Sequence, residues 1–358
     1  MFEKRKIDAN GENYMEHIFP NAWLKAKILA GRTVSFSENV PALLCNKNNS
    51  ENHHHDEWIF IRLSETSRVR LVIDDNNPTF SIIYKENSGL TLLNNQTGEE
   101  LIQGLNLEDA VIHAPDQLFL GLYEYCRIGC KFCPLHATQG TMLHYSLDSI
   151  YKDIDDSSKK SYSSIGITTS IPYNLASDDV ADEMIFVVRK IREKVGFNIP
   201  IGVSTRIPSE QIMEQLKSAG ANEIRLNIEV PNSQLSHKLM PNKSLEDIYN
   251  SLALACKVFG KGKVSSNIVL GLGESDQDVI CAIRRLAKLG VIATLYPYDP
   301  FDGDKRLDLK FDRPDAERIY RLAVSHKEIL DEYQLSTSTL LTMCPACAAS
   351  HVFPGKDL

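Results

Sequence analysis

The feature that most limits the fold of this chain is a run of alternating strand and helix patterns after residue 116. Each strand pattern is a short apolar stretch, and each helix pattern has apolar residues three or four positions apart. The strand patterns cover 117–125, 164–169, 200–205, 223–230, 264–270 and 291–296. The helix patterns cover 146–159, 177–195, 208–219, 245–259, 277–289 and 313–333.

Six strand–helix units in a row predict a parallel sheet covered by helices, because each parallel pair needs a right-handed crossover connection. We therefore predict an α/β fold, a six-stranded partial (β/α)6 barrel of the TIM type. In a barrel of this kind the reactive groups are carried where the strands end, at their carboxyl ends.

The first part of the chain has a different pattern. One short helix pattern at 21–31 is followed by alternating segments at 58–63, 69–73 and 80–84, which turn residues separate. We predict a small antiparallel, β-rich module there. The expected domains are this module at 1–115, the barrel at 116–335 and a C-terminal tail at 336–358.

Composition narrows the class of protein. With 43% hydrophobic residues the 358-residue chain can bury a large core, and no apolar run approaches the ~20 residues of a membrane span. A net charge of −8 gives no general attraction to nucleic acid or to anionic lipid. The chain opens Met-Phe-Glu-Lys-Arg-Lys, without an apolar signal segment, so we expect a cytoplasmic protein with reduced thiols.

Three cysteines follow the first barrel strand. Cys126, Cys130 and Cys133 have the spacing C-x3-C-x2-C. Three thiolates so close together can hold three irons of a [4Fe-4S] cluster and leave the fourth iron open to a small ligand. A zinc site needs a fourth ligand, and only His136 and His144 lie nearby. Three structural or incidental cysteines are the other alternative.

These cysteines, the aromatic Phe132 and the six strand–helix units after them resemble the radical S-adenosylmethionine (radical SAM) superfamily. Within it, residues 130–137 and 267–275 are similar to biotin synthase. The resemblance implies a [4Fe-4S] cluster and S-adenosylmethionine as cofactors. An electron from a ferredoxin or flavodoxin-type donor then cleaves the sulfonium, and the 5'-deoxyadenosyl radical abstracts hydrogen from an unactivated carbon.

The resemblance also suggests contacts to S-adenosylmethionine at the strand ends. Where relatives carry a Gly-Gly-Glu-like segment for the methionine amino group, this chain has hydroxyl groups instead. Arg206 is either a carboxylate contact or an ordinary surface arginine, whereas the alternation in the fourth strand favours a lumen position for Asn227 and Glu229. The predicted cofactor-binding residues are Phe132, Thr168, Thr169, Ser170, Ser204, Arg206, Asn227, Glu229 and Gly271. Further candidates for the lumen lining are Tyr125, His136, Asn174, Tyr296, Tyr298 and Asp299.

A second group of cysteines lies elsewhere. Cys344 and Cys347 form a C-x2-C pair in the tail, and Cys45 is a candidate third ligand, with Ser350 or His351 as a fourth. We predict an auxiliary iron–sulfur cluster there; a redox-active dithiol and an inert pair are the alternatives. Lipoyl synthase resembles this arrangement only in its use of a second cluster with a serine ligand.

The leading functional prediction is a radical SAM enzyme of the sulfur-inserting transferase type, similar to biotin and lipoyl synthases. Its substrate would be an aliphatic small molecule or an acyl group on a carrier protein. The alternative within enzymes is a radical SAM mutase, lyase or methyltransferase without sulfur donation. The alternative outside enzymes is an iron–sulfur electron-transfer or scaffold protein, and a nucleic-acid partner is disfavoured by the acidic charge.

Overall fold

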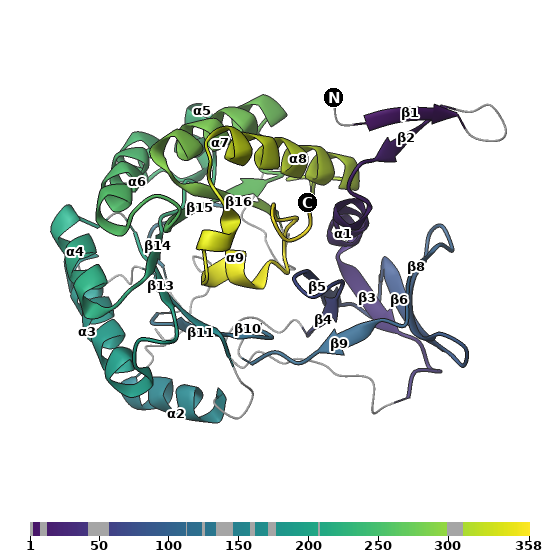
Figure 1. Cartoon of the computed structure of the whole chain (residues 1–358), viewed down its shortest axis with the longest axis horizontal. Coiled ribbons are helices and arrows are strands. Elements are labelled where there is room, and N and C mark those ends of the chain that lie inside the picture. The colour runs from purple at the N-terminus through teal and green to yellow at the C-terminus, as the bar shows by residue number, and fades with distance from the viewer. Residues whose placement is uncertain are drawn as a thin grey trace. The chain divides into compact units, whose positions relative to one another are not determined.

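The computed structural model describes residues 3–7, 13–41, 57–111, 113–123, 126–133, 146–157, 162–170, 177–206, 208–298 and 311–358. The chain divides into two compact units (Figure 1). Unit 1 comprises Met1–Asp109, Pro314–Glu328 and Ala348–Leu358, and unit 2 comprises Ala110–Arg313 and Ile329–Cys347. Each unit is described below by itself.

Unit 2 is built on a seven-stranded sheet in which the strands follow one another in chain order. The short β10 (His113–Ala114) pairs antiparallel with β11, and every later neighbouring pair is parallel. The parallel strands are β11 (Gln117–Gly121), β12 (Ser164–Thr168), β13 (Ile201–Ser204), β14 (Glu223–Arg225), β15 (Val264–Leu270) and β16 (Ile292–Pro297). This arrangement confirms the predicted α/β fold with a partial parallel barrel.

Helices cover the outer side of this curved sheet (Figure 1). They are α2 (Leu147–Ser157), α3 (Ser177–Val195), α4 (Glu210–Ala219), α5 (Ser233–Leu239), α6 (Leu245–Phe259) and α7 (Asp276–Leu289). Ser209, Ser244 and Ser275 each accept a hydrogen bond at the start of a helix, which is why α4, α6 and α7 begin there.

Two short elements from the end of unit 2 were not predicted from the sequence. They are the 3-10 helix η4 (Thr337–Thr339) and α9 (Met343–Cys347), and α9 lies inside the curve of the strands in Figure 1. Glycines on two neighbouring strands make room for it. A Cβ on Gly202 would come within 2.0 Å of Thr342 Oγ1, and one on Gly166 within 2.9 Å of Met343 Sδ.

Unit 1 combines a helix with a mixed sheet. Its seven-stranded sheet has the order β8-β7-β6-β3-β5-β4-β9, and β1 (Glu3–Ile7) and β2 (Asn13–His17) form a separate antiparallel pair. The strands of the large sheet are β3 (Thr33–Phe36), β4 (Trp58–Arg62), β5 (Arg68–Ile73), β6 (Phe80–Lys85), β7 (Gly89–Asn94), β8 (Glu100–Gln103) and β9 (Asn106–Glu108). The prediction of a purely antiparallel module is wrong for β3, which is parallel to both β5 and β6. The long connection from β3 to β4 permits this, since a parallel pair needs a crossover and not a tight turn.

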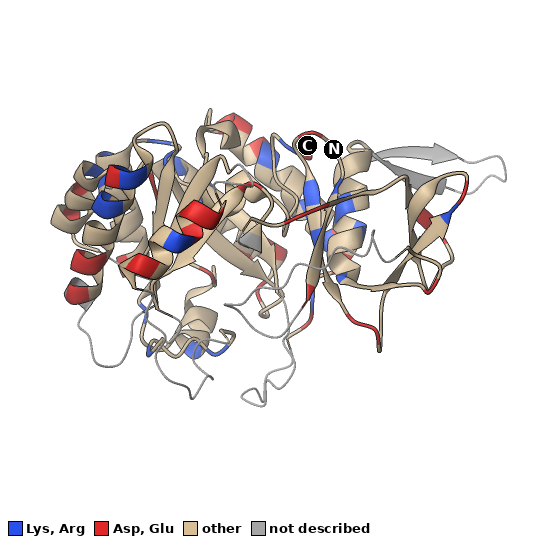
Figure 2. Ribbon diagram, turned by 90° about the horizontal axis from the view of Figure 1, so that it is seen from below, with Lys and Arg blue, Asp and Glu red and all other residues tan. Residues whose placement is uncertain are grey.

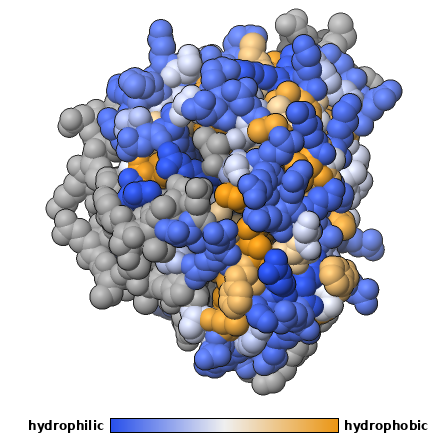
Figure 3. Space-filling model, turned by 90° about the vertical axis from the view of Figure 1, so that its left-hand side faces the viewer, coloured by the Kyte–Doolittle hydropathy of each residue, from blue (hydrophilic) through white to orange (hydrophobic). Residues whose placement is uncertain are grey.

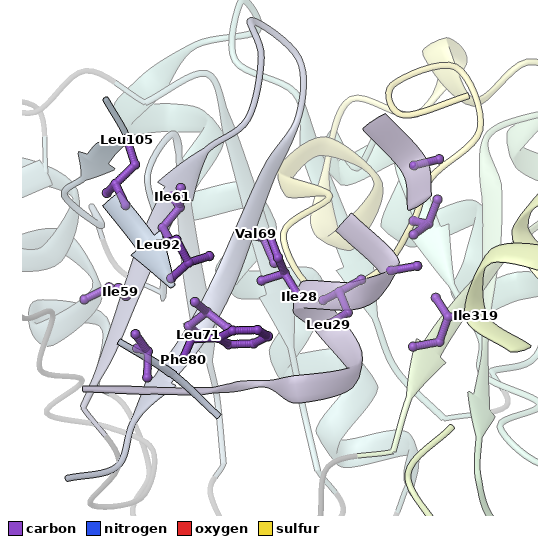
Figure 4. Close-up of a cluster of buried hydrophobic side chains, with 14 of the residues drawn as sticks. Ile28, Leu29, Ile59, Ile61, Val69, Leu71, Phe80, Leu92, Leu105 and Ile319 are labelled. Carbon is purple, nitrogen blue, oxygen red and sulfur yellow. The ribbon is translucent and has the colours of Figure 1, made fainter. Parts of the chain in front are cut away.

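The core of unit 1 lies between this sheet, α1 (Pro20–Gly31) and the first part of α8 (Ala316–Glu332). Figure 4 shows Ile28 and Leu29 of α1 and Ile319 of α8 in the same apolar cluster as side chains from the strands. Trp23 also meets Tyr320 edge to face, with ring centroids 5.8 Å apart. The helix predicted at 313–333 as the last barrel helix therefore packs, up to Glu328, within unit 1.

The surface carries both signs of charge. Figure 2 shows acidic and basic residues interspersed along the helices of unit 2. The face viewed in Figure 3 is mainly hydrophilic, with a few hydrophobic areas between the polar ones. Among the described helices, none combines the length and the apolar character that crossing a membrane requires.

Candidate active site

The cysteine triplet forms a tight loop just beyond the carboxyl end of β11. Gly129 has a φ of 75°, a left-handed conformation that glycine adopts without strain between Cys126 and Cys130. The backbone N–H of Cys133 donates to the carbonyl of Cys130 over 3.1 Å, which closes the second half of the loop. The three thiols therefore belong to one short, turned segment.

A segment far along the chain holds this loop in place. The Lys131 N–H donates to the carbonyl of Leu239 at the end of α5, over 2.9 Å. Asn242 Nδ2 donates to the carbonyl of Ile128 over 3.1 Å, and Arg206 Nη2 donates to the carbonyl of Asn242 over 2.7 Å. The connection from α5 to α6, which the sequence analysis did not single out, is thus the support of the cysteine loop.

The loop borders a pocket at the carboxyl ends of the parallel strands. The cavity has a volume of about 200 Å³. The pocket brings together all but one of the predicted cofactor-binding residues with the cysteine triplet. It is lined by Cys126, Ile128, Cys130, Phe132, Cys133, Thr168, Thr169, Ser170, Ser204, Thr205, Arg206, Arg225, Leu226, Asn227, Glu229, Lys243 and Ile248.

Two hydroxyl groups that follow β12 already donate their protons to backbone carbonyls. Thr169 Oγ1 donates to the carbonyl of Ser170 over 2.9 Å, and Ser170 Oγ donates to the carbonyl of Tyr123 over 2.9 Å. Each of these two hydroxyls has used its proton and can only accept further hydrogen bonds. A hydroxyl that only accepts suits an ammonium group, which has donors alone.

Asn227, Glu229 and Lys243 form a second polar group in the pocket lining. Glu229 Oε2 accepts from Lys243 Nζ over 3.3 Å, and Asn227 Oδ1 accepts from the Asn267 N–H over 3.2 Å. Glu229 has a φ of 57°, which is uncommon for a residue with a side chain, and its backbone bridges to β15 at Ile268. This conformation lies four residues after β14, and the Glu229 side chain lines the pocket.

Burial and the charge of Lys243 have opposite effects on the pKa of the Cys130 thiol. Burial raises the pKa of the Cys130 thiol to about 12, while the nearby Lys243 ammonium acts to lower it. The pKa of Lys243 is itself raised: burial lowers it, but the charges of Glu229 and of the Cys130 and Cys126 thiolates outweigh this effect. Buried thiolates need positive charge beside them, which a metal cluster supplies.

The site fits a [4Fe-4S] cluster in its donor chemistry. Cys126, Cys130 and Cys133 all line the pocket from one short loop. Within the described ranges no three metal-binding side chains already surround one point, so the thiols would turn about their side-chain bonds to hold the cluster. The remaining hydroxyl, amide and charged groups of the pocket suit a polar cofactor beside it.

Several predicted residues lie elsewhere. Gly271 does not line the pocket; its N–H and that of Leu272 each donate to the Glu274 carboxylate over 2.8 Å, which shapes the turn before α7. Tyr298 is 5% exposed and packs edge to face on Phe311. Tyr296 is part of β16 and is also absent from the lining. Four further predicted lumen residues and one predicted metal ligand fall outside the described residues: Tyr125, His136, Asn174, Asp299 and Cys45.

The C-terminal cysteines lie on α9. Cys344 Sγ accepts a hydrogen bond from Arg225 Nη1 over 3.1 Å, and Arg225 in turn lines the pocket. Cys347 ends the same helix. Ser350 and His351 belong to unit 1, whereas both cysteines belong to unit 2.

Sequence analysis missed two charged residues of the pocket, Arg225 and Lys243. The signal for Arg225 was present, since it lies two positions before Asn227 on the strand whose alternation predicted a lumen position for Asn227 and Glu229. Lys243 had no such signal, because it lies in an irregular connection between two helices.

The fold and the site define a partial parallel barrel with a thiol-lined pocket at its strand ends. Residues 121–286 match the family model of the Radical SAM superfamily, so the chain carries a radical SAM domain. This family uses a [4Fe-4S] cluster and S-adenosylmethionine, the two cofactors that the resemblance implied.

Solved structures give more distant similarities. The chain is similar to methylornithine synthase, with 19% identity, a TM-score of 0.49, and coverage of 59% of this chain and 62% of the other. The hydrogenase maturase HydG of Carboxydothermus hydrogenoformans is 16% identical, with a TM-score of 0.48 and coverage of 61% of this chain and 52% of the other. A radical SAM methyltransferase of Sphaerobacter thermophilus is 18% identical, with a TM-score of 0.48 and coverage of 69% of this chain and 70% of the other. The chain thus spans about half to two thirds of the length of the first two proteins.

Proposed function

We propose that this chain is an enzyme that uses its radical SAM domain to abstract hydrogen from an aliphatic carbon of a substrate bound in the barrel lumen. The observation that carries the proposal is the pocket itself, in which the three cysteines share one lining with hydroxyl, amide and charged side chains from three further strand ends. When bound, the cluster and S-adenosylmethionine supply one-electron chemistry that yields methionine and a 5'-deoxyadenosyl radical.

The protein's own residues have positioning roles in this proposal. Cys126, Cys130 and Cys133 hold the cluster, and Phe132 lies between two of them. The hydroxyl groups of Thr168, Thr169, Ser170 and Ser204 accept from the amino group of S-adenosylmethionine, while Asn227 and Glu229 bind its ribose. Arg206 remains a candidate for its carboxylate, although one Nη is already donating to Asn242. A lumen that holds the reacting groups close together and keeps water out gives most of the rate advantage.

The direct test is formation of 5'-deoxyadenosine by anaerobically reconstituted protein with dithionite and S-adenosylmethionine. Cys130→Ala should abolish it, because two thiolates cannot hold the cluster with an open iron. Cys281→Ala is the matched control, since Cys281 is exposed on α7 and should leave product formation unchanged. If reconstituted protein with the full iron content forms no 5'-deoxyadenosine, the chain is an electron-transfer or scaffold protein instead.

For the outcome of the reaction we propose sulfur insertion into the substrate carbon, as in biotin and lipoyl synthases. Support comes from Cys344 and Cys347, a thiol pair on a helix whose first cysteine is hydrogen-bonded to a pocket residue. They would supply two of the ligands of an auxiliary cluster that serves as the sulfur source. Iron analysis tests this: about eight irons per chain supports two cubes, whereas about four removes the sulfur donor.

The second candidate is a mutase, lyase or methyltransferase reaction in the same pocket. It is favoured if Cys344 and Cys347 bind no iron, because the Arg225 contact then serves to fix α9 in the lumen. In either case we propose a cytoplasmic enzyme with a ferredoxin or flavodoxin-type donor. Its substrate is a small molecule or an acyl group on a carrier protein.

A further inference from the structure

Among the described residues, one buried cation in the pocket has no acidic partner. Arg225, the last residue of β14, is 7% exposed and lines the pocket. Its guanidinium donates from Nε to Ser204 Oγ over 3.2 Å and from Nη1 to Cys344 Sγ over 3.1 Å. Among the described residues no carboxylate pairs with it, and Nη2 has no hydrogen-bond partner. A buried charge without a counter-ion is costly, so a bound anion would be strongly stabilised there.

The acids that lie nearest to Arg225 in the sequence, Glu223 and Glu229, are already engaged. Glu223 accepts from the N–H groups of Leu341 and Thr342 over 2.8 and 3.0 Å, and from Thr342 Oγ1 over 2.6 Å. Glu229 pairs with Lys243. The charged lining of the pocket therefore consists of three cations, Arg206, Arg225 and Lys243, and one carboxylate. This balance favours an anionic ligand over a cationic one.

Neighbouring strands add polar groups that lack partners. Asn267 Oδ1 and Thr294 Oγ1 are buried, and neither has a hydrogen-bond partner among the described residues. They share the face of Arg225, because Arg225 is in register with Ser265 on β15 and Asn267 is in register with Thr294 on β16. Buried polar groups without partners are rare in proteins, and a polar ligand or water normally satisfies them.

Arg225 and Lys243 lie in different parts of the pocket lining. Lys243 directly follows Asn242, whose side chain donates to the Ile128 carbonyl in the cysteine loop over 3.1 Å. Arg225 instead contacts α9, which packs against β11 and β12 inside the barrel (Figure 1). A charged group of a cofactor bound at the cysteine loop would meet Lys243, whereas Arg225 is placed for a second molecule deeper in the lumen.

We propose that the substrate carries a carboxylate and that the Arg225 guanidinium binds it at the inner end of the pocket. This inference rests on the proposed function and narrows its substrate to a carboxylic acid. Nη2 and the remaining Nη1 proton form the edge of the guanidinium that can donate two parallel hydrogen bonds to one carboxylate. Ser204 and Cys344 hold that edge in a fixed orientation.

The test compares matched anionic and neutral probes on the reconstituted holoprotein with S-adenosylmethionine present. Butyrate and hexanoate are titrated against butyramide and hexanamide by calorimetry. The wild type should bind each acid at least about tenfold more tightly than its amide. Arg225→Gln should bring this ratio close to one, and Arg225→Lys should give an intermediate value because lysine keeps the charge without the planar edge. Arg284→Gln, an exposed arginine on α7, is the control and should keep the wild-type ratio.

Other results would overturn the assignment. Equal binding of acid and amide by the wild type excludes a carboxylate site, and this arm does not depend on whether Arg225→Gln folds. If only the Cys344→Ala variant prefers the acid over the amide, the Cys344 thiolate is the counter-ion of Arg225 in the wild type. Weaker S-adenosylmethionine binding by Arg225→Lys with an unchanged acid-to-amide ratio assigns the arginine to the cofactor. A carboxylate preference without 5'-deoxyadenosine formation refutes the proposed function and leaves this binding site standing.

Discussion

At the scale of single residues, Arg192 shows how one buried side chain can hold several loops. Its guanidinium donates to the carbonyls of Gly220, Gly196 and Ile199 over 2.6–2.9 Å, and to Asn222 Oδ1 over 2.5 Å. Those groups lie at the end of α3, before β13, and between α4 and β14. The residue is 5% exposed, so these acceptors have little access to water as a replacement.

Arg192→Met should therefore destabilise the protein by about 3–5 kcal/mol, since it leaves several buried carbonyls without donors. The free energy of unfolding in urea measures this. Arg189→Met is the matched control on the same helix; Arg189 is exposed, so its loss should cost less than about 0.5 kcal/mol. Equal effects of the two substitutions would show that the Arg192 hydrogen bonds contribute nothing beyond the loss of an arginine.

At the scale of elements, Glu223 fixes the segment that leads into α9. This carboxylate is 3% exposed and accepts from two backbone N–H groups and one hydroxyl of residues 341 and 342, besides its ion pair with Lys263. The start of β14 thereby sets where α9 lies within the barrel. Since Cys344 lies on α9 and contacts Arg225, the same carboxylate also positions one wall of the site.

Glu223→Gln should weaken this segment by about 2–3 kcal/mol, because an amide nitrogen would replace one of the accepting oxygens and face an N–H donor. Hydrogen exchange at the amides of Leu341 and Thr342 should become faster. Glu214→Gln, at an exposed position on α4, should change neither stability nor exchange. Unaltered protection of residues 341 and 342 in Glu223→Gln would mean that packing alone holds α9.

These elements also show what sequence can and cannot predict. The strands and helices of the barrel followed from periodicity, and their order placed the residues after β11, β12, β13 and β14 at one edge of the sheet. The segment 337–347 could not be predicted, because its place depends on two glycines and a carboxylate on strands far away in the sequence. The alternation that predicted a lumen position for Asn227 applies to Arg225 as well, but sequence could not show that no carboxylate among the described residues pairs with it.

At the scale of the whole chain, a buried ion pair ties the last residues to the first helix within unit 1. Lys25 Nζ lies 2.8 Å from Asp357 Oδ2, and both side chains are at most 1% exposed. Lys25 also donates to the carbonyl of Ala348 over 2.6 Å, and Asp357 accepts from the Phe353 N–H over 2.7 Å. The C-terminal segment is thus part of the core of unit 1.

Lys25→Met should cost about 3–5 kcal/mol, because it leaves the Asp357 carboxylate buried and unpaired. The double variant Lys25→Met, Asp357→Leu should recover a large part of that loss. Lys27→Met is the control, since the Lys27–Glu99 pair is exposed and should contribute at most about 1 kcal/mol. Additive losses in the double variant, measured by thermal or urea unfolding, would contradict a coupled pair.

Two buried histidines give the molecule a specific response to acid. No ring nitrogen of His326 or His351 has a hydrogen-bond partner among the described residues. Burial lowers the pKa of His326 to about 3. Burial, followed by the charges of Lys25, Lys356 and His326, lowers that of His351 well below its usual value. The folded protein therefore keeps both imidazoles neutral.

In the unfolded chain both histidines take up protons below pH ~6.5, so unfolding becomes easier as the pH falls below that value; for His326 this window extends down to about pH 3. Each should contribute a loss of up to about 1.4 kcal/mol per pH unit in this window, and nothing above pH ~6.5. His326→Leu should flatten the dependence of the free energy of unfolding on pH between 6 and 4 while changing stability little at pH 8, because leucine needs no hydrogen-bond partner. His237→Leu, at an exposed position on α5, should leave the slope as in the wild type. An unchanged slope in His326→Leu would show that this imidazole is already protonated in the folded state.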